Sequence, residues 1–330
     1  MKEAVLVTGV AGFIGSHLGE RLLRLGYSVV GLDNLDSFYD PAIKRENIRA
    51  LEDNSSFRMI RGDIRDKELL NRIFSENSIS LVAHLAARAG VRPSLQLPLL
   101  YQDVNIGGTI NMLEASRSSG VRQFVFASSS SVYGLNSRVP FREDDKIDYP
   151  TSPYAASKSA GELFCRTYHH LYGLPVKALR LFTVYGPRQR PEMAIHSFAR
   201  KIEAGEEIPV YGDGTAKRDY TYIDDIIDGI MGALTSRDPG FQIYNLGDSS
   251  PIDIMSLVRL LEKSLGKTAR VKNLPQQPGD VPITYADISR AGVDLGYRPA
   301  VPIERGVELF VRWYRQSVAR LAGNVAGHTN

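Results

Sequence analysis

The residues best suited to proton transfer are Tyr154 and Lys158, at the start of a helix predicted after Pro153. Their four-residue spacing places the phenol and the ammonium on one face of that helix, one turn apart. A free tyrosine has a pKa of about 10, so a tyrosine base at neutral pH needs its phenolate stabilised. The ammonium of Lys158 would supply that stabilisation. The alternative is that both residues belong to an ordinary exposed helix face.

A second pattern predicts a dinucleotide site. The segment Gly9–Gly15, with a glycine at every third position, joins the first predicted strand to the first helix. Such glycines permit a tight turn and let the backbone approach a pyrophosphate at the helix N-terminus. Asp33 closes the second strand, where an acid can bond the adenosine ribose and would repel the 2′-phosphate of NADP. We therefore favour a dinucleotide site over a plain strand–helix turn, and NAD over NADP as the cofactor. The residues expected to hold it are Gly9, Gly12, Phe13, Ile14, Gly15 and Asp33.

The elements that position these groups alternate between strands and helices. Short, nearly continuously apolar runs predict strands buried on both faces. Apolar stripes at helical spacing lie between them, and the first of these ends at Gly26. This alternation predicts a doubly wound, parallel, Rossmann-type α/β sheet. The predicted strands are Ala4–Val7, Val29–Leu32, Phe57–Ile60, Leu81–His84, Phe124–Ala127 and Val176–Leu181, with Gln242–Leu246 as one more.

The 330 residues exceed what one hydrophobic core usually serves, so two lobes are expected. After about Phe182, prolines and glycines punctuate the chain, with a helix predicted over Ile223–Leu234. The second lobe is therefore predicted to be smaller, mixed α/β and made of two segments. We assign residues 1–182 and about 220–250 to the NAD-binding domain, and about 183–219 and 251–320 to the substrate-binding lobe. Residues 321–330 are expected to form a flexible tail.

Composition and charge exclude several functional classes. Forty Lys+Arg against 37 Asp+Glu gives a net charge of +3 with no basic tract, so no nucleic-acid partner is expected. The six histidines and one cysteine show no metal-ligand spacing, so no metal is expected. The apolar opening Ala4–Ile14 is broken by glycines and predicts neither a signal peptide nor a membrane span. A single cysteine suits a reducing compartment, and we expect a cytoplasmic protein.

Further motifs run the length of the chain. They are Gly62-Asp63-Ile64, His84-Leu85-Ala86-Ala87 and Asn105. Together with the glycine spacing and the Tyr-x-x-x-Lys pair, they resemble the extended, sugar-nucleotide-modifying branch of the short-chain dehydrogenase/reductase superfamily. The resemblance implies that Asp63 and Ile64 flank the adenine. The cofactor contacts that the resemblance implies are Asn34, Asp63, Ile64, Leu85, Ala86, Ala87, Asn105, Tyr154 and Lys158.

The serine tract Ser128–Ser131 follows the fifth predicted strand, at the edge where ligands of parallel sheets bind, although serines are also common in turns. The resemblance implies that Ser129 is the hydroxyl partner of Tyr154 and completes the catalytic set with Lys158. Ser130 would then face the sugar. Related 4,6-dehydratases carry an Asp-Glu pair here and UDP-glucuronate decarboxylases carry a Glu, because their chemistry needs an acid. This tract has no carboxylate, so the resemblance implies 4-epimerisation.

Three segments, residues 33–45, 84–92 and 181–194, resemble the UDP-glucuronate 4-epimerase group. The last has Thr183 where UDP-glucose 4-epimerases commonly have asparagine, followed by Arg190. Oxidising C4 of a uronate makes a β-keto acid, which loses CO₂ when its carboxylate stands perpendicular to the carbonyl plane. Thr183 and Arg190 would hold the carboxylate away from that alignment. The alternative for Arg190 is a solvated loop or a diphosphate contact.

The resemblance implies further contacts to a UDP-sugar in the second lobe. Arg218 aligns with an arginine that binds the UDP diphosphate, while Gln277 stands where a second such arginine is usual. Asp280 lies in the same segment and is also expected to touch the substrate. Tyr211 is expected either to stack on uracil or to be a core aromatic.

The expected reaction converts UDP-glucuronate to UDP-galacturonate through a transient 4-keto sugar. The nearest rival is a 4-epimerase of UDP-glucose or UDP-N-acetylglucosamine. A rival from another class is a non-catalytic NAD-binding regulator, although such proteins usually lose the Tyr/Lys pair. The resemblance also implies a homodimer through the helices near Val104–Ser116 and Tyr154–Leu171.

Overall fold

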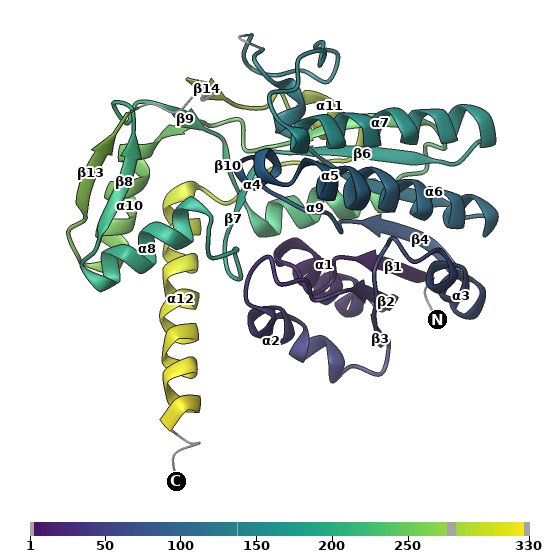
Figure 1. The fold of residues 1–330 in the computed structure, drawn as a ribbon, viewed down its shortest axis with the longest axis horizontal. Helices are drawn as coiled ribbons and strands as arrows, with labels where there is room; N and C mark the ends of the chain where they lie inside the picture. Colours follow the sequence, from purple (N-terminus) through teal and green to yellow (C-terminus); the bar gives the residue numbers. More distant parts are fainter. Residues whose placement is uncertain (1–2, 137, 276–281, 327–330) are drawn as a thin grey trace.

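The computed structural model describes residues 3–136, 138–275 and 282–326 of the chain. Its largest element is a parallel sheet of seven strands in the order β11-β6-β5-β4-β1-β2-β3 (Figure 1). The predicted doubly wound α/β fold is therefore confirmed, and each predicted strand is present within one or two residues of its ends. The strands are β1 (Ala4–Thr8), β2 (Ser28–Asp33), β3 (Phe57–Arg61), β4 (Ile79–His84), β5 (Gln123–Ser129), β6 (Val176–Leu181) and β11 (Phe241–Leu246).

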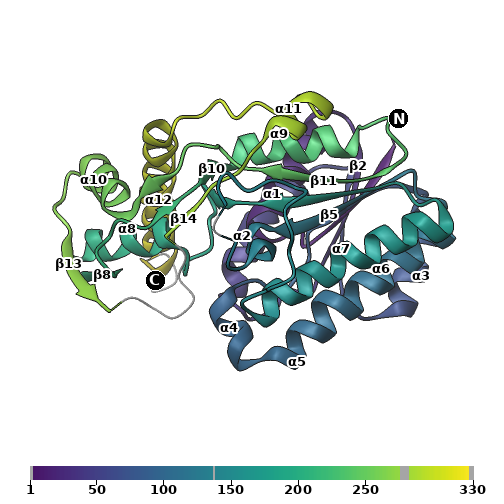
Figure 2. The same ribbon diagram turned by 90° about the horizontal axis from the view of Figure 1, so that it is seen from above.

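Helices cover both faces of this sheet, which explains why its inner strands are mostly apolar (Figure 2). One face packs against α1 (Phe13–Arg24), α2 (Pro41–Glu52) and α9 (Ile223–Leu234). The other packs against α3 (Lys67–Asn77), α6 (Gly108–Ser118) and α7 (Pro153–Tyr172). Helix α9 begins and ends where the sequence predicts it.

The order of the strands reverses beside β1. The chain moves outward from β1 through β2 to β3, and then returns to place β4 on the opposite side of β1. In open parallel sheets, a crevice forms at such a reversal, outside the carboxyl ends of the strands. The glycine segment after β1 lies at this crevice.

Two connections carry short helical elements. The connection from β4 to β5 contains α4 (Val91–Gln96), α5 (Pro98–Tyr101) and a π-helix, η1 (Gln102–Gly107). A short 3₁₀ turn, η2 (Ser130–Tyr133), follows β5.

The remaining elements lie at one end of the large sheet (Figures 1 and 2). They include three small sheets. One pairs β10 with β7, one places β9 between β12 and β14, and one pairs β13 with β8. Strands β8 and β13 are parallel although about sixty residues separate them, and α8 packs on α10 and α10 on α12. These elements are β7 (Thr183–Tyr185), α8 (Ala194–Ala204), β8 (Glu207–Tyr211), β9 (Lys217–Arg218), β10 (Tyr220–Tyr222), β12 (Ile252–Asp253), α10 (Ile254–Leu265), β13 (Arg270–Leu274), β14 (Ile283–Thr284), α11 (Ser289–Asp294) and α12 (Ile303–Ala326).

Helix α12 extends further than the sequence analysis expected. It continues through Ala326, so most of the segment 321–330, assigned to a tail, is helical, and residues 327–330 lie outside the described part of the chain. The leucine and alanines of residues 321–326 favour helix. Within the described residues, none of the helices combines the length and apolar character needed to cross a bilayer.

Candidate active site

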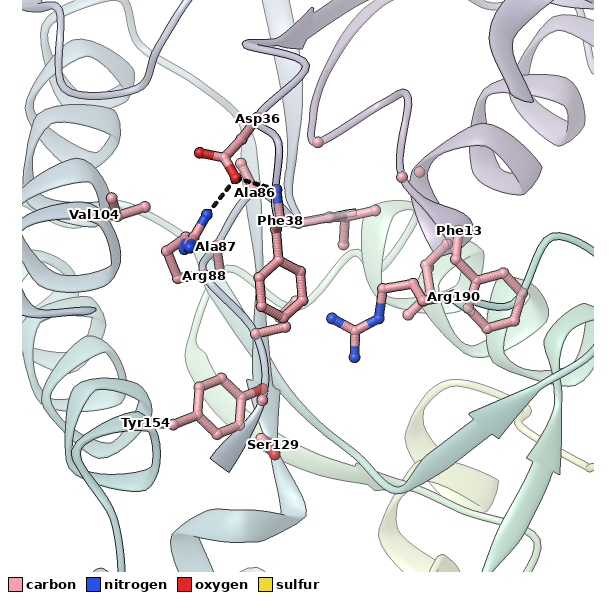
Figure 3. Close-up of a pocket in the computed structure, with 18 of the residues that line it drawn as sticks. Phe13, Asp36, Phe38, Ala86, Ala87, Arg88, Val104, Ser129, Tyr154 and Arg190 are labelled. Carbon is pink, nitrogen blue, oxygen red and sulfur yellow. Dashed lines mark hydrogen bonds and ion pairs between the residues drawn. The ribbon is translucent and has the colours of Figure 1, made fainter. Parts of the chain in front are cut away.

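One cleft gathers most of the predicted site residues. It lies at the carboxyl ends of β1, β2, β4 and β5, with the glycine segment at one end and Tyr154 at the other (Figure 3). Residues predicted from the sequence that line it are Gly9, Gly12, Phe13, Ile14, Gly15, Asp33, Asn34, Asp63, Ile64, Leu85, Ala86, Ala87, Ser129, Ser130, Tyr154, Lys158, Thr183 and Arg190. The cleft therefore brings an expected cofactor site and an expected catalytic group into one space.

The turn between β1 and α1 is built for glycine. Gly9 has a φ of +71°, and a Cβ there would lie 2.9 Å from the backbone nitrogen of Ala86. A Cβ on Gly15 would lie 2.1 Å from the carbonyl oxygen of Gly9. Helix α1 begins after Gly12, which has no side chain to cap it, and its first turn has no acidic residue. The positive end of the helix dipole is thus free to bind an anion, so this turn fits a pyrophosphate.

Asp33 is held at the end of β2, where a ribose could reach it. Its carboxylate accepts hydrogen bonds from the backbone nitrogens of Ala11 (3.1 Å) and Leu35 (2.8 Å). Burial raises the pKa of Asp33, while those two N–H groups and the charge of Lys44 act in the opposite direction. A carboxylate can accept more than two hydrogen bonds, so capacity remains for ribose hydroxyls.

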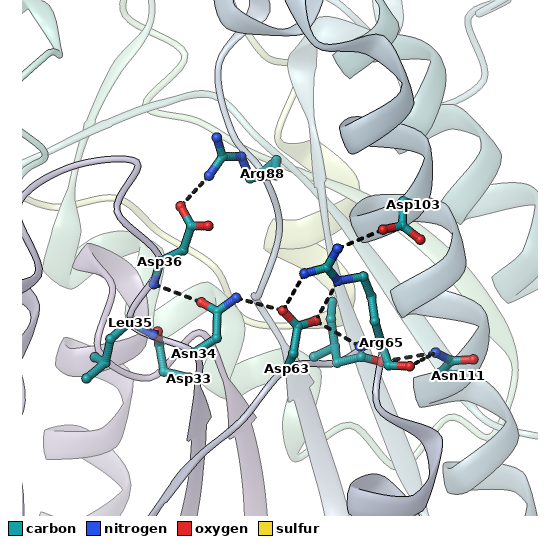
Figure 4. A network of polar contacts seen from close by, with 10 residues as sticks. Asp33, Asn34, Leu35, Asp36, Asp63, Arg65, Arg88, Asp103 and Asn111 are labelled. Carbon is teal, nitrogen blue, oxygen red and sulfur yellow. Dashed lines mark hydrogen bonds and ion pairs between the residues drawn. The ribbon is translucent and has the colours of Figure 1, made fainter.

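Asp63, at the expected adenine end, belongs to a network that the sequence analysis did not foresee (Figure 4). It accepts a hydrogen bond from the amide of Asn34 at 2.8 Å and forms an ion pair with Arg65 at 2.9 Å. Arg65 also pairs with Asp103 at 2.7 Å. Hydrogen bonds from Arg65 lower the pKa of Asp63 to about 2, so this carboxylate is charged at neutral pH.

Tyr154 and Lys158 lie on α7 as predicted, with the Ser152 hydroxyl capping the helix by accepting from the Ala155 N–H at 3.1 Å. Burial raises the pKa of Tyr154, and a hydrogen bond with Ser129 and the charge of Arg190 oppose that effect. The Lys158 ammonium donates to the Ala127 carbonyl at 2.6 Å, and burial lowers its pKa to about 8. In the protein alone, therefore, Lys158 is engaged with the backbone. For the pKa of Tyr154, the effect of burial is larger than the opposing effects of the Ser129 hydrogen bond and the Arg190 charge.

A buried ion pair supports the serine tract from behind. Arg180 on β6 bonds both carboxylate oxygens of Glu162 on α7, at 3.0 and 2.8 Å. Glu162 in turn accepts a hydrogen bond from the Ser128 hydroxyl. All three side chains are buried, so they fix the end of β5 against α7. The sequence analysis missed this pair, although a glutamate one turn after Lys158 and an arginine inside an apolar strand were visible signals.

Asn105, an expected cofactor contact, lies behind the cleft on η1. Its side-chain oxygen accepts from the Arg88 N–H at 2.7 Å, and its amide donates to the Arg88 carbonyl at 3.0 Å and to the Ser157 hydroxyl at 2.9 Å. Ser157 donates to the carbonyl of Tyr154 at 2.8 Å. Asn105 thus ties the loop after β4 to the helix that carries Tyr154, and a π-helix at such a position is common near functional sites.

At the sugar end, Arg190 points into the cleft opposite Tyr154 and Ser129 (Figure 3). Its guanidinium pairs with Glu192 at 3.2 Å and lies 5.7 Å from the ring centroid of Phe38. Arg88, which the sequence analysis did not single out, also lines the cleft, and its guanidinium lies 4.9 Å from the ring centroid of Phe38. Of the described residues, the acids that line this cleft are Asp33, Asp36 and Asp63, which follow β2 and β3.

Two further predicted substrate contacts, Tyr211 and Arg218, are not among the residues that line this cleft. Tyr211, at the end of β8, carries the guanidinium of Arg92 over its ring at 5.1 Å. Arg218 lies on β9 and donates to the Lys217 carbonyl at 2.9 Å. Asp280 lies outside the described residues. Within the described part of the chain, His, Cys, Asp and Glu side chains form no group of three suited to a metal ion.

Known proteins match this chain over nearly its whole length. The family model described as GDP-mannose 4,6 dehydratase matches residues 6–310. UDP-glucuronate 4-epimerase 4 of Arabidopsis thaliana is 47% identical over 328 residues, covering 94% of this chain and 75% of that protein. UDP-glucuronate 4-epimerase of Thermodesulfobacterium geofontis is 46% identical over 314 residues, covering 95% and 96%. The solved structure of UDP-glucuronic acid 4-epimerase from Bacillus cereus with UDP-glucuronic acid and NAD has a TM-score of 0.89 at 39% identity, covering 95% and 99%.

Proposed function

This chain belongs to the GDP-mannose 4,6 dehydratase family of extended short-chain dehydrogenases/reductases, and on that premise we propose that it is an NAD-dependent UDP-glucuronate 4-epimerase. The observation that carries the proposal is the single cleft in which a glycine turn suited to a dinucleotide meets Tyr154, Ser129 and Arg190. The product from UDP-glucuronate is UDP-galacturonate. The Bacillus cereus neighbour, with UDP-glucuronic acid and NAD bound, supports both the substrate and the cofactor.

The side chains divide the chemistry as follows. Tyr154 accepts the proton of the sugar 4-hydroxyl, and Ser129, which is hydrogen-bonded to the phenol, orients that exchange. Bound NAD supplies reversible oxidation and reduction at C4. The 4-keto sugar then presents its other face, and Tyr154 returns the proton to the new 4-hydroxyl. Oxidation and reduction cancel over one turnover, so the same bound cofactor serves again.

The position of the acids in the cleft favours epimerisation over dehydration, the reaction after which the family is named. Among described residues, the lining carboxylates come from the loops after β2 and β3, and the tract Ser128–Ser131 beside Tyr154 contributes hydroxyls only. Elimination of water from a 4-keto sugar needs an acid–base pair at the neighbouring carbons. The serine tract does not provide one, and reversible oxidation does not require it.

The uronate is favoured by the cation at the sugar end. Arg190 points toward the space in front of Tyr154, and Thr183 lines the same end. A guanidinium binds planar carboxylates with two parallel hydrogen bonds. Holding the carboxylate in this way keeps the 4-keto uronate from the perpendicular geometry that expels CO₂. Tyr211, Arg218 and Asp280 remain proposed contacts to the UDP portion.

The direct test compares substrates. We expect purified protein to convert UDP-glucuronate to UDP-galacturonate with a higher kcat/KM than for UDP-glucose or UDP-N-acetylglucosamine, measured by separating the epimers chromatographically. A preference for either neutral sugar would establish the rival 4-epimerase instead. Failure to turn over any of the three by a protein that binds NAD would favour the non-catalytic regulator.

Replacing Arg190 tests the carboxylate contact. Arg190→Ala removes a charged hydrogen bond worth about 1.5–3 kcal/mol, so we expect kcat/KM for UDP-glucuronate to fall about tenfold or more. UDP-glucose lacks the carboxylate and should lose far less, and a UDP-pentose by-product is expected from the loosened uronate. An equal loss for both sugars would place Arg190 at the diphosphate or in loop support.

The same proposal divides the chain into two functional parts. Residues 1–182 and about 220–250 form the NAD-binding domain, and about 183–219 and 251–320 form the UDP-sugar-binding lobe. The return of β11 to the large sheet, beside β6, supports this division. The grouping of α8, α10 and α12 with the small sheets also supports it.

We also propose a homodimer through α6 and α7. These two helices pack side by side on one face of the large sheet. Helix α7 exposes Leu163 (64%), Leu171 (59%) and Tyr172 (51%). Several exposed large apolar side chains on one helix favour a protein interface.

A further inference from the structure

A chain of polar contacts joins residues that line the cleft to Asp103 beside it, and we call it the polar belt (Figure 4). It has three ion pairs, and an asparagine amide joins the first of them to the other two. The amide of Asn34 accepts from the Asp36 N–H at 2.9 Å and donates to Asp63 at 2.8 Å. The members of the belt, in order, are Arg88, Asp36, Asn34, Asp63, Arg65 and Asp103.

The belt joins segments that are far apart in the sequence. Arg88 follows β4, Asp36 follows β2, Arg65 follows β3 and Asp103 lies on η1. The two ends of the belt are also tied indirectly, because Asn105, two residues after Asp103 on η1, holds the backbone of Arg88 through hydrogen bonds of 2.7 and 3.0 Å. Strands β2 and β4 flank β1 in the sheet. The ion pair between Asp36 and Arg88 therefore spans the glycine segment that follows β1.

The Arg88 guanidinium is anchored on one side and unsatisfied on another. It pairs with Asp36 Oδ1 through Nη1, and it lies 4.9 Å from the ring centroid of Phe38. Its side chain is 15% exposed, and its buried Nε has no hydrogen-bond partner among the described residues. Because this Nε is buried even with the cleft empty, the guanidinium is held in place mainly by Asp36 and the Phe38 ring.

We propose that the Arg88–Asp36 ion pair is a latch that keeps NAD bound between turnovers. The inference rests on the proposed function for its cofactor, but it concerns retention rather than chemistry. An epimerase regenerates its cofactor each cycle and gains nothing from releasing it. With the latch closed, the loops after β2 and β4 are joined over the dinucleotide, and the pair must open before NAD can leave.

The test measures NAD release without substrate. Wild-type protein, Arg88→Gln, Asp36→Asn and the double variant are loaded with radiolabelled NAD, and loss of label into excess unlabelled NAD is followed. Breaking a half-buried charged pair should speed release about tenfold in each single variant. The double variant should be no faster than the single variants, because both act through one contact. Arg88→Lys keeps the charge and should release NAD at an intermediate rate.

Controls separate the latch from other effects. Arg122→Gln breaks an ion pair with Glu3 at the opposite ends of the strands and should leave release unchanged. Thermal unfolding of each variant shows that it is folded. Release within twofold of wild type in both single variants overturns the latch. Faster release in Arg88→Gln alone also overturns it, because Arg88 would then hold NAD without Asp36. A wild-type protein that binds no NAD contradicts the proposed cofactor itself, which is a distinguishable failure.

Discussion

Tyr154 is placed where its proton affinity depends on what binds beside it. Burial raises the pKa of its phenol, and a hydrogen bond with Ser129 and the positive charge of Arg190 across the cleft oppose this effect. Lys158, one turn further along α7, donates to the Ala127 carbonyl. A phenol in this setting holds its proton unless a further positive charge is added nearby. An oxidised nicotinamide bound in the cleft would supply such a charge and would favour the phenolate.

Tyr154→Phe removes only the phenol oxygen from this arrangement. We expect turnover of UDP-glucuronate to fall by about 100-fold or more, the usual contribution of a positioned acid–base group. The NAD content of the purified protein should be unchanged, because the glycine segment and Asp33 are untouched. Turnover within tenfold of wild type would remove Tyr154 from the role of base.

Lys158 gives a prediction about pH and stability in the protein without NAD. Burial lowers the pKa of Lys158 from 10.5 to about 8, so the unfolded chain binds more protons than the folded one between these values. The cost of holding the charge buried is fully present below pH 8 and disappears as pH rises to about 10.5. A gap of this size corresponds to about 3 kcal/mol.

The variant Lys158→Met cannot carry this cost at any pH. The difference in melting temperature, variant minus wild type, should therefore be largest near pH 7. It should become smaller as pH rises through 8 to about 10.5. Thermal unfolding followed by circular dichroism in a series of buffers measures the difference. A difference that does not change over this range would show that Lys158 has an ordinary pKa in the folded protein.

At the scale of elements, α1 and α7 have different ways of presenting their first turns. Helix α7 starts with a serine cap and directs Tyr154 and Lys158 into the cleft. Helix α1 starts after Gly12 with no side-chain cap, and its approach to β1 is set by the absence of side chains at Gly9 and Gly15. The first arrangement positions side chains, whereas the second positions backbone N–H groups.

Two glycines of α1 allow a matched test of that arrangement. A Cβ on Gly15 would stand 2.1 Å from the backbone oxygen of Gly9, which cannot move without displacing the turn. A Cβ on Gly19, one turn later, would meet only a Leu51 methyl at 3.0 Å, which can rotate away. We expect Gly15→Ala to weaken NAD binding at least tenfold by calorimetry, and Gly19→Ala to leave it within twofold. Equal effects would show that the turn does not bind the pyrophosphate.

At the scale of the whole molecule, the chain leaves the large sheet twice and returns to it in between. It leaves the large sheet after β6, builds β7 to β10, returns through α9 and β11, and leaves again to form α10, β13 and α12. Thr183 and Arg190, which follow β6, line the cleft. On the proposed function, substrate binding would therefore depend on how the segments after β6 sit against the large sheet.

The proposed dimer is tested by adding charge to the exposed side of α7. Leu163→Glu should shift the protein from two chains to one in light scattering after size exclusion, because a buried unpaired carboxylate opposes association. Val293→Glu is the control, since Val293 is 84% exposed on α11, on the side of the sheet that α9 covers. A wild-type protein that runs as a single chain, or a Leu163→Glu variant that remains dimeric, would contradict an interface through α7.

Local patterns in the sequence were sufficient for the large sheet and the cofactor end of the site. Strands buried on both faces appear as continuous apolar runs, and the spacing of Gly9, Gly12 and Gly15 needs no distant partner. Short strands such as β9 and β14 could not be predicted in this way. They have two residues each and exist only because they pair across the chain. The π-helix η1 was also missed, because its geometry depends on contacts with α7 and the loop after β4.

The sequence by itself determined the fold class, the parallel sheet, the preference for a dinucleotide and the placement of Tyr154 beside Lys158, since each depends on periodicity or close spacing. Only the tertiary structure decided which charges meet. It paired Arg180 with Glu162 behind the serine tract, engaged Lys158 with the backbone at Ala127, and formed the polar belt from Arg88 to Asp103. The physical reason is that side chains from separate loops interact only after the parallel sheet has brought their carboxyl ends to one edge.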